Sequence, residues 1–502
     1  MLRRTGSCLT ASALCLALAL PGQAQSADRF EAPGLTDRGG TPIASGDYGL
    51  PSLTHGGSQA ISGEELRLGR AWLRQFRARA PEWQDAIAQD YVESLVARLL
   101  PHSGLSRAET VVTLVESRLL NAFAVPGGVI GVNAGLFAFA EREAELASVV
   151  AHELGHLAQR HYARGRERAE QTQIPTMAAM LAGMLLAAGG GGDAGIAAAM
   201  GTQAAFIQDQ LRYSRRFEQE ADRVGLQAMA GAGYDPEAMV EMFRAMQRMV
   251  SLQGGNPPEF LLSHPMTESR ISDTQARASQ TTVATPRGEA LEYALVRARA
   301  LLAIHDRDPQ QAATRLAQDQ APAAARRYLA ALLDARAGRT DRALNALDAL
   351  ARAHPDLAML PATAAQVAFA AGRTDDAVSR SRAQLRLMPD YVPTRRLLGE
   401  ALLQRDPDEA YRVLRELAER RPEDPQVFTL LAEAAGRSGR EAWGHLARAE
   451  QLQLTGHIDR AIRQLEVAKE VAERQGEPAA TSAIERRREA FLGYRETLEE
   501  FR

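Results

Sequence analysis

The chain has 502 residues, with 62 acidic and 59 basic side chains and a formal net charge of −3. So small a net charge gives no electrostatic reason to expect a nucleic-acid partner. The hydrophobic content of 45% is that of a globular protein and excludes general disorder, and the length allows about two to three domains.

The N-terminus has the layout of a secretory signal peptide. Two arginines are followed by an apolar run from Leu9 to Leu20 and by small residues up to Ala24. Because a membrane-spanning helix needs about 20 apolar residues, the run is too short for a membrane anchor. We therefore predict that residues 1–24 are a cleavable export signal.

Both cysteines of the chain, Cys8 and Cys15, lie inside this signal. The exported protein would then have no disulfide, no thiol nucleophile and no cysteine metal ligand. Residues 25–60 are rich in Gly, Ser, Pro and Thr, which predicts a flexible leader.

Two helices and a small group of strands are predicted next. Ser62 and Glu65 form a capping box at the start of an amphipathic helix, and a second helix is predicted at about 81–100. The β-branched run Thr110–Val115 predicts a strand. Ala122–Val125 and the run Val129, Ile130, Gly131, Val132 predict an antiparallel ribbon, because Pro and two Gly separate them as a turn.

Two longer helices are predicted at about 141–164 and 208–230. The segment Met177–Ala205 between them is rich in Ala, Met and Gly. Its apolar part is too short for a transmembrane helix, so we expect a buried hairpin. A flap that contacts membrane or substrate is the alternative.

Small residues and prolines of the C-terminal part recur every 34 positions. The pairs are Gly338 and Gly372, Ala343 and Ala377, and Pro355 and Pro389. This period is typical of tetratricopeptide repeats, and it predicts about four units within 290–475 followed by a C-terminal helix at 476–502. A later copy is predicted at Gly456 and Ala461, whereas 436–450 fits the pattern poorly. An irregular helical domain is the alternative.

The sequence His152-Glu153-Leu154-Gly155-His156 carries the chemistry. Residues four apart share one face of a helix, so both imidazoles can bind one Zn²⁺ at about 2.0–2.1 Å. Glu153 lies at the edge of that face, where it can act as a general base towards water without binding the metal. A helix with two surface histidines is the alternative, and the apolar residues that precede the motif at helical spacing argue against it.

Catalytic zinc needs a third protein ligand, and the next predicted helix offers Glu218, Glu220 and Asp222. Glu218 and Asp222 share a face, whereas Glu220 points about 160° away from Glu218. If Glu218 binds zinc, Asp222 stands one turn further on, where it can orient a histidine ligand. A solvated acidic face is the alternative.

Three blocks of the sequence resemble the signature of one zinc metallopeptidase family. They are residues 121–128 (NAFAVPGG), the histidine motif, and residues 213–222 (YSRRFEQEAD). The family includes the CAAX prenyl endopeptidases and the HtpX membrane proteases, and its third zinc ligand corresponds to Glu218. The order of signal, peptidase and repeats resembles its periplasmic branch.

The resemblance implies two further functional regions. In such peptidases a strand beside the active site pairs with extended substrate, and the strand Val129–Val132 is the candidate here; completing the sheet is its alternative role. The block Ser263-His264-Pro265, followed by residues 268–271 (ESRI), also matches the family. His264 is a candidate fourth zinc ligand that keeps the enzyme latent, and it is also a candidate for binding substrate or supporting the fold.

We therefore predict a mainly α-helical protein in which a gluzincin-like metallopeptidase domain with a small β-sheet, at 61–285, precedes a tetratricopeptide superhelix. The resemblance implies a periplasmic zinc endopeptidase that binds one Zn²⁺ per chain and degrades unfolded or misassembled envelope proteins. Its repeats would contact outer-membrane assembly machinery. A chaperone or adaptor with a latent peptidase site, and a zinc peptidase of another envelope process, are the alternatives.

Overall fold

The computed structural model describes residues 61, 63–105, 110–169, 214–252 and 259–500. The predicted signal peptide, the leader, Ser62 and the segment Met177–Ala205 lie outside these residues. Among the residues described, no helix combines the length and the apolar character needed to cross a membrane.

A three-stranded mixed sheet lies within the N-terminal half. Its strands are β1 (Val111–Val115), β2 (Ala122–Val125) and β3 (Val129–Asn133), in the order β1-β3-β2. Runs of β-branched and apolar residues favour strands, of which β1 and β3 are almost entirely buried here, and all three were predicted from the sequence. The pair β2–β3 is the predicted antiparallel ribbon, while β1 adds to β3 in parallel.

This sheet order shows that the prediction for the substrate strand was wrong. Val129 pairs with Val111 on one side and with Val125 on the other, and the same double pairing continues to Val132. Both edges of β3 are therefore occupied within the sheet, which leaves no backbone groups to pair with a substrate. The alternative role, in which Val129–Val132 completes the sheet, is the one that the structure has.

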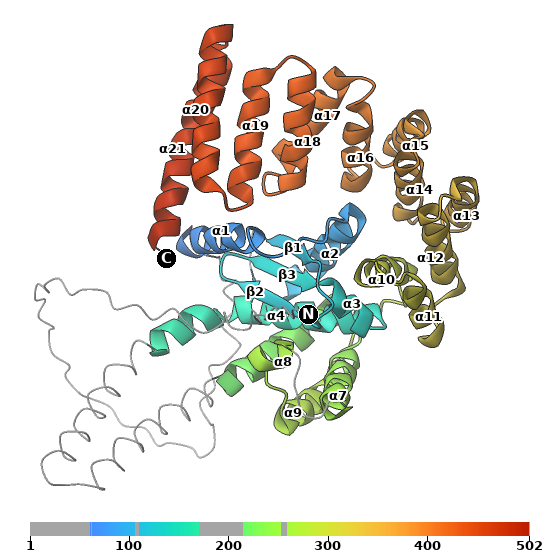
Figure 1. Ribbon diagram of the computed structural model, residues 1–502. Helices are drawn as coiled ribbons and strands as arrows, with labels where there is room; N and C mark the ends of the chain where they lie inside the picture. The colour runs from blue at the N-terminus through green and yellow to red at the C-terminus, as the bar shows by residue number, and fades with distance from the viewer. Residues whose placement is uncertain (1–60, 62, 106–109, 170–213, 253–258, 501–502) are drawn as a thin grey trace, which may run out of the picture. The chain divides into compact units, whose positions relative to one another are not determined.

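Four helices pack beside this sheet, namely α1 (Gly63–Arg77), α2 (Ala86–Leu99), α3 (Ala134–Phe139) and α4 (Glu143–Ala158). Beyond α4 lie α7 (Glu237–Leu252), α8 (Glu259–Ser263) and α9 (Glu268–Ala278) (Figure 1). A 3-10 turn at Leu100–His102 and further helical stretches at 161–169 and 214–231 complete this part of the chain that the structure describes.

Two predicted helix boundaries were wrong, each for a local reason. α2 begins at Ala86 rather than near residue 81, because the Asp85 side chain accepts hydrogen bonds from the backbone N–H groups of Ile87 and Ala88 and so caps the helix there. The predicted helix 141–164 is interrupted after Ala158, where Arg160 has a φ of 50°. A left-handed residue cannot continue a right-handed helix, so the chain changes direction before residue 161.

The remaining helices form an antiparallel array. They are α10 (Leu291–Ile304), α11 (Gln310–Gln318), α12 (Ala323–Arg336), α13 (Thr340–Ala353), α14 (Met359–Ala370), α15 (Thr374–Leu387), α16 (Val392–Leu402), α17 (Pro407–Arg420), α18 (Pro425–Arg437), α19 (Glu441–Leu454), α20 (Ile458–Gln475) and α21 (Pro478–Glu500).

The predicted 34-residue period corresponds to one helix pair of this array. Gly338, Gly372 and Gly439 have φ values of 75°, 74° and 75° and form equivalent turns between the paired helices. The stretch 436–450 is therefore a regular turn and helix, contrary to the poor fit expected. The sequence pattern fails there because Gly444 stands five residues after its turn glycine, where the earlier units have Ala343 and Ala377.

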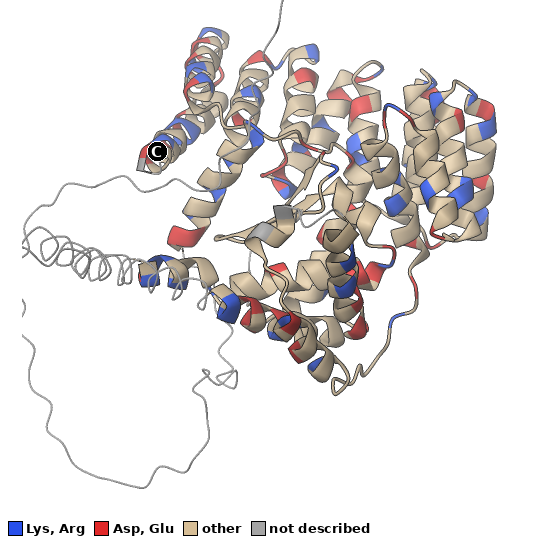
Figure 2. Cartoon of the chain, turned by 60° about the horizontal axis from the view of Figure 1, so that its bottom comes forward, with Lys and Arg blue, Asp and Glu red and all other residues tan. Residues whose placement is uncertain are grey.

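Acidic and basic side chains are mixed along these helices (Figure 2). Several form a ladder in which an arginine just before one helix pairs with an aspartate in the first turn of an earlier helix. The pairs are Arg373–Asp341, Arg405–Asp375 and Arg440–Asp408. Exposed pairs of this kind contribute little to stability because solvent and salt screen them, so packing rather than charge holds the array together.

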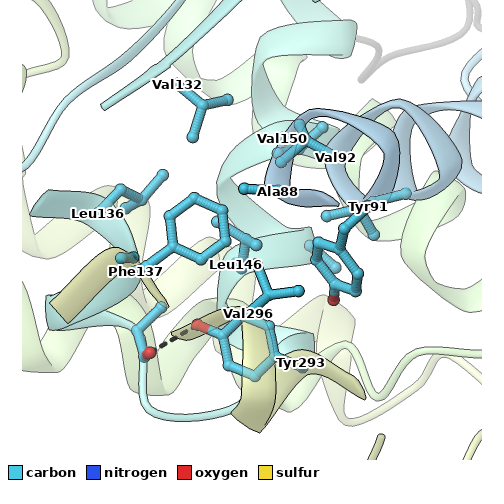
Figure 3. Packing of buried hydrophobic residues seen from close by; sticks show 14 of the residues in the cluster. Ala88, Tyr91, Val92, Val132, Leu136, Phe137, Leu146, Val150, Tyr293 and Val296 are labelled. Atoms are coloured by element: carbon cyan, nitrogen blue, oxygen red, sulfur yellow. Dashed lines mark hydrogen bonds between the residues drawn. The ribbon is translucent and has the colours of Figure 1, made fainter. Parts of the chain in front are cut away.

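One apolar cluster joins the peptidase-like half to the first repeats. Its buried residues, which lie between Trp83 and Ala377 in the sequence, form a single cluster of side chains in contact. Figure 3 shows Tyr91 of α2, Phe137 of α3 and Tyr293 of α10 close to Leu146 of α4, and the Tyr293 hydroxyl donates a hydrogen bond of 2.6 Å to the Ala140 carbonyl. The first repeat helix is thus part of the same core as the sheet.

The far end of the array contacts α1. Arg74 of α1 is 3% exposed and its Nε donates a hydrogen bond of 2.6 Å to Gln453 of α19. Ala71 of α1 belongs to an apolar cluster with residues of α19, α20 and α21. The array therefore begins and ends against the first half of the chain.

Candidate metal centre

Three segments bring four metal-binding side chains together. His152 and His156 come from α4, Glu218 from the helix 214–231, and His264 from the residue after α8. One donor atom of each lies within 4.8 Å of the others. His152 and Glu218 are 2% and 3% exposed, so the cluster is enclosed by protein on most sides.

The distances between donors fit a single tetrahedral ion. His152 Nε2 lies 3.0 Å from His156 Nε2 and 3.4 Å from Glu218 Oε2, and His156 Nε2 lies 3.4 Å from Glu218 Oε1. Donors bound tetrahedrally at about 2.0–2.1 Å are about 3.3 Å apart, which is the spacing seen here. Two imidazoles and a carboxylate are also a donor set that suits zinc.

His264 completes the cluster on a fourth side. Its Nδ1 lies 3.2 Å from Glu218 and 3.3 Å from His152 Nε2. The geometry is compatible with all three roles considered for His264, which are metal binding, contact with a bound substrate and support of the fold.

Glu153 borders the cluster without joining it. Its side chain is 2% exposed, and its Oε1 has no hydrogen-bond partner among the residues described. The nearest basic group is His264 Nε2, at 3.5 Å. Burial raises the pKa of Glu153, while His264, His152 and a backbone hydrogen bond from Ala124 lower it, and the net effect is a rise. A buried carboxylate with a free oxygen and a raised pKa is suited to accept and return a proton.

Asp222 lies beside the ring of His152. The Nδ1 of His152 lies 2.9 Å from Asp222 Oδ1, on the side of the ring away from the other donors. This is the arrangement expected for a carboxylate that fixes a ligand histidine.

Arg270 was not assigned a role from the sequence, although it belongs to the block around His264. It is 2% exposed and binds both oxygens of Asp222, at 2.8 and 2.7 Å. Its Nη1 also contacts Glu218 Oε2 at 2.9 Å and the Pro265 carbonyl at 3.0 Å. Arg270 therefore ties together two acidic residues of the site and the loop of His264.

The pKa values of the carboxylates follow from these contacts. Burial would raise the pKa of Asp222, but Arg270 and His152 outweigh it and lower the pKa. Burial would likewise raise the pKa of Glu218, but hydrogen bonds from His152 and His264 hold it well below its usual range. Both groups are thus acceptors in their charged form.

Glu220 lies outside the donor cluster, as its direction on the helix predicted. It is 7% exposed and contacts His161 at 3.2 Å, Arg164 at 2.7 Å and Arg216 at 3.0 Å. His161 is a second buried residue that the sequence did not single out, because its place depends on the break after α4.

Among the residues that the structure describes, no strand pairs with the outer edge of β2, which lies beside this site. The backbone N–H of Asn133 donates to the Asn121 carbonyl, so Ala122 and Ala124 of β2 direct their polar backbone groups away from β3. β2 packs against α4, and the Ala124 backbone contributes a hydrogen bond to Glu153. The edge strand next to the candidate base is therefore β2.

Comparison with known proteins agrees with this geometry. A model of peptidase family M48 matches residues 86–278, and a model of the tetratricopeptide repeat matches residues 368–434. The chain is 31% identical over 425 residues to the beta-barrel assembly-enhancing protease of Escherichia coli (strain K12), an alignment that covers 84% of this chain and 86% of the relative.

Two further relatives extend the comparison. The beta-barrel assembly-enhancing protease of Yersinia pestis is 30% identical over 423 residues, covering 82% of this chain and 86% of the relative. The mitochondrial metalloendopeptidase OMA1 of Arabidopsis thaliana is 27% identical over 224 residues, covering 42% and 39%. An alignment that spans most of both chains, with the buried donor cluster inside the matched segment, leads to one conclusion: the chain belongs to peptidase family M48 and is a metallopeptidase that carries tetratricopeptide repeats.

Proposed function

We propose that the protein is a zinc-dependent endopeptidase of the periplasm that cleaves unfolded or misassembled outer-membrane proteins. The observation that carries the proposal is the buried cluster of His152, His156 and Glu218. Beside it lies a Glu153 oxygen that has no hydrogen-bond partner within the described part of the chain. We assign residues 61–285 to the peptidase domain and 290–475 to the repeats.

His152, His156 and Glu218 would hold the metal, and Asp222 would orient His152. Bound zinc would polarise the scissile carbonyl and make water more acidic. Glu153 would take a proton from the attacking water and return it to the leaving amine, for which its raised pKa is suited. Arg270 would keep Asp222 charged and in place.

Substrate would bind as an extended strand along β2. The backbone groups of Ala122 and the Ala124 carbonyl face outward and would pair with it, while the Ala124 N–H bonds to Glu153 and so keeps this edge next to the candidate base. Because backbone pairing does not depend on side-chain identity, it suits an enzyme that cuts many unfolded sequences.

The cellular role rests on the relatives and on the N-terminus. Two of them are named for β-barrel assembly, and the signal-like residues 1–24 favour export. The repeats would then contact envelope substrates or the machinery that assembles outer-membrane proteins, since arrays of this kind usually present a binding surface.

A Glu153→Gln variant tests the proposal. We expect it to keep zinc and lose peptidase activity, because it removes a base and not a ligand. When it is expressed in cells and purified from their envelope, it should retain bound outer-membrane β-barrel precursors, which mass spectrometry can identify.

The comparison variant is Glu218→Gln, which should bind zinc less tightly. Full zinc content and activity in that variant would show that Glu218 is not the third ligand. Recovery of cell-wall enzymes instead of β-barrel precursors from the Glu153→Gln trap would favour another envelope process.

A second candidate function is a chaperone or adaptor whose peptidase site is latent. The observation in its favour is His264, which stands where a fourth donor would be. If the Glu153→Gln variant rescues the envelope defects of cells that lack the protein as well as the unaltered protein does, this second function is supported. If it fails to rescue them, proteolysis is supported.

A further inference from the structure

His161 makes a contact on the outer side of a metal-binding histidine. Its Nδ1 lies 2.9 Å from the Nδ1 of His156, and the two rings meet edge to face with centroids 4.9 Å apart. The other nitrogen of His156, Nε2, faces the donor cluster. His161 is therefore in contact with the side of His156 that does not face the metal.

The backbone is arranged to make this contact. On an uninterrupted helix a residue five positions after His156 would point about 140° away from it. The left-handed conformation of Arg160, with a φ of 50°, breaks the helix and redirects His161 towards His156. A non-glycine residue in this region is uncommon and often marks a functional position.

A buried chain of hydrogen bonds continues behind His161. Its Nε2 lies 3.2 Å from Glu220 Oε2, and Glu220 is bound by Arg164 at 2.7 Å and by Arg216 at 3.0 Å. The ring of His161 also stacks on Phe217, with centroids 4.2 Å apart. His161 is 5% exposed, so these contacts fix it without competition from solvent.

Only one assignment of protons satisfies all these contacts when both rings are neutral. His156 must leave Nε2 free to bind metal, so its Nδ1 carries the proton and donates to His161 Nδ1. His161 then carries its proton on Nε2 and donates to Glu220. Glu220 accepts this bond and those of the two arginines.

We propose that His161 is a positioning residue of the metal site, which fixes the orientation and tautomer of His156 and is itself fixed by Glu220. This inference rests on the proposed function, in which His156 is a zinc ligand. The ring of His152 contacts the carboxylate of Asp222 directly. The ring of His156 is connected to the carboxylate of Glu220 through the imidazole of His161. Outer partners of this kind are worth about 10–100-fold in metal affinity.

The test measures zinc affinity of the full-length protein by competition with a chelator. His161→Phe keeps the stack on Phe217 and removes both nitrogens, and we expect it to weaken zinc binding by about 10–100-fold. His161→Gln offers an oxygen to the His156 N–H and should recover part of the loss. Glu220→Gln should weaken binding in the same direction and by less.

A second readout separates positioning from a merely structural role. The visible spectrum of the cobalt-substituted protein depends on the geometry of the ligands, so it should change in His161→Phe and return towards the original in His161→Gln. His445→Phe is the matched control, because His445 is a part-buried histidine of α19 whose Nδ1 contacts Gln464, and its zinc affinity and spectrum should not change.

Unchanged zinc affinity and an unchanged cobalt spectrum in both His161→Phe and Glu220→Gln would overturn the inference. Should His161→Phe fail to fold, Glu220→Gln and His161→Gln still decide it. His156→Ala tests the proposed function separately: if it retains zinc, the metal site itself is wrong, whatever the His161 variants show.

Discussion

His264 is a single side chain that contacts both the donor cluster and the candidate base. Its Nδ1 lies 3.2 Å from both Glu218 oxygens, and its Nε2 lies 3.5 Å from Glu153. A donor at this place would occupy the position that a catalytic zinc site keeps open for water or substrate. Neutral imidazole is a common zinc ligand, so the loop after α8 is suited to keep the enzyme latent.

We therefore expect His264→Ala to raise basal proteolysis. A latent state favoured by about 1.4 kcal/mol holds about nine-tenths of the molecules closed, so its removal would raise the rate roughly tenfold. A casein-type assay, with zinc content measured in both proteins, gives the result. Lower activity at unchanged zinc content would mean that His264 binds substrate or supports the fold instead.

Asp90 is a carboxylate held between the two halves of the chain in an unfavourable environment. Burial raises its pKa to about 6, Glu93 and Glu292 add to the rise, and Arg421 opposes it. The unfolded chain has an aspartate pKa near 3.9, so below about pH 4 the residue is protonated in both states and costs nothing. Between about pH 4 and 6 the unfolded state ionises first, so stability is lost as the pH rises.

Asp90→Asn should therefore stabilise the protein at pH 7–8 by roughly 1–3 kcal/mol, since each pKa unit corresponds to about 1.4 kcal/mol. The gain should disappear near pH 4. Urea unfolding at both pH values measures it. Asp341→Asn is the control of opposite sign, because the hydrogen bond and charge of Arg373 lower the pKa of Asp341. An equal gain at pH 4 would show that the effect of Asp90→Asn is not electrostatic.

At the scale of elements, the spacing of residues predicted the structural features that depend only on residues close together in the sequence. The three strands, the two histidines on one face of α4 and the opposite directions of Glu218 and Glu220 all follow from spacing alone. The sheet order does not, because the parallel pairing of β1 with β3 depends on how distant segments pack. The substrate strand was misplaced for this reason.

Some site residues also could not be predicted. Arg270 reaches the site from α9 and His161 reaches it only because Arg160 breaks the helix. No pattern in the sequence marks a left-handed arginine, and an arginine beside acidic residues is common on helix surfaces. Both roles follow from three-dimensional contacts alone.

Two turn glycines of the array have similar backbones and different surroundings. Gly439, between α18 and α19, has a φ of 75° and open space where a Cβ would lie. Gly456, between α19 and α20, has a φ of 80°, and a Cβ there would collide with the Arg74 carbonyl and lie 2.8 Å from Ala78 Cβ. The backbone of the array is thus in close contact with the end of α1 at Gly456.

Comparing Gly456→Ala with Gly439→Ala should isolate this contact. Both changes carry the backbone strain of a left-handed alanine, about 1–2 kcal/mol. Gly456→Ala should lower the free energy of unfolding by more, because the methyl group must also push α1 away from the array. It should also expose α1 to limited proteolysis, which Gly439→Ala should not. Equal losses in the two variants would mean that the α1 contact contributes nothing to stability.

At the scale of the whole molecule, the peptidase half and the repeats are joined by hydrogen bonds from a side chain to the backbone as well as by a shared core. Arg297 of α10 is 2% exposed; its Nε donates to the Phe137 carbonyl at 2.9 Å and its Nη2 to the Ala138 carbonyl at 3.2 Å. These carbonyls end α3, where a helix leaves acceptors unpaired. Arg297, at the start of the array, therefore caps a helix of the other half. It also binds Asp319 of the array at 2.5 Å.

Arg297→Ala should therefore destabilise both halves together. It leaves two carbonyls at the end of α3 without their donor, and each buried acceptor left unpaired costs about 1–3 kcal/mol, whereas Asp319 keeps its contact with Arg315. Arg373→Ala, which breaks an exposed pair with Asp341, is the control and should change stability little. Thermal unfolding followed by fluorescence separates the halves, because Trp83 lies in the shared core and Trp443 in α19.

In variants that keep only Trp83 or only Trp443, the two transitions should fall to lower temperature by similar amounts when Arg297 is replaced. The physical reason is that the array meets the first half of the chain at both ends, through α10 at the start and through α1 at Arg74 and Gly456. Loosening the contact at α10 leaves only the contact with α1 to hold the array against the first half of the chain. If the temperature of the Trp443 transition does not change while that of the Trp83 transition falls, the repeats unfold independently of the first half. A partner bound to the repeats could then not affect the metal site through this shared core.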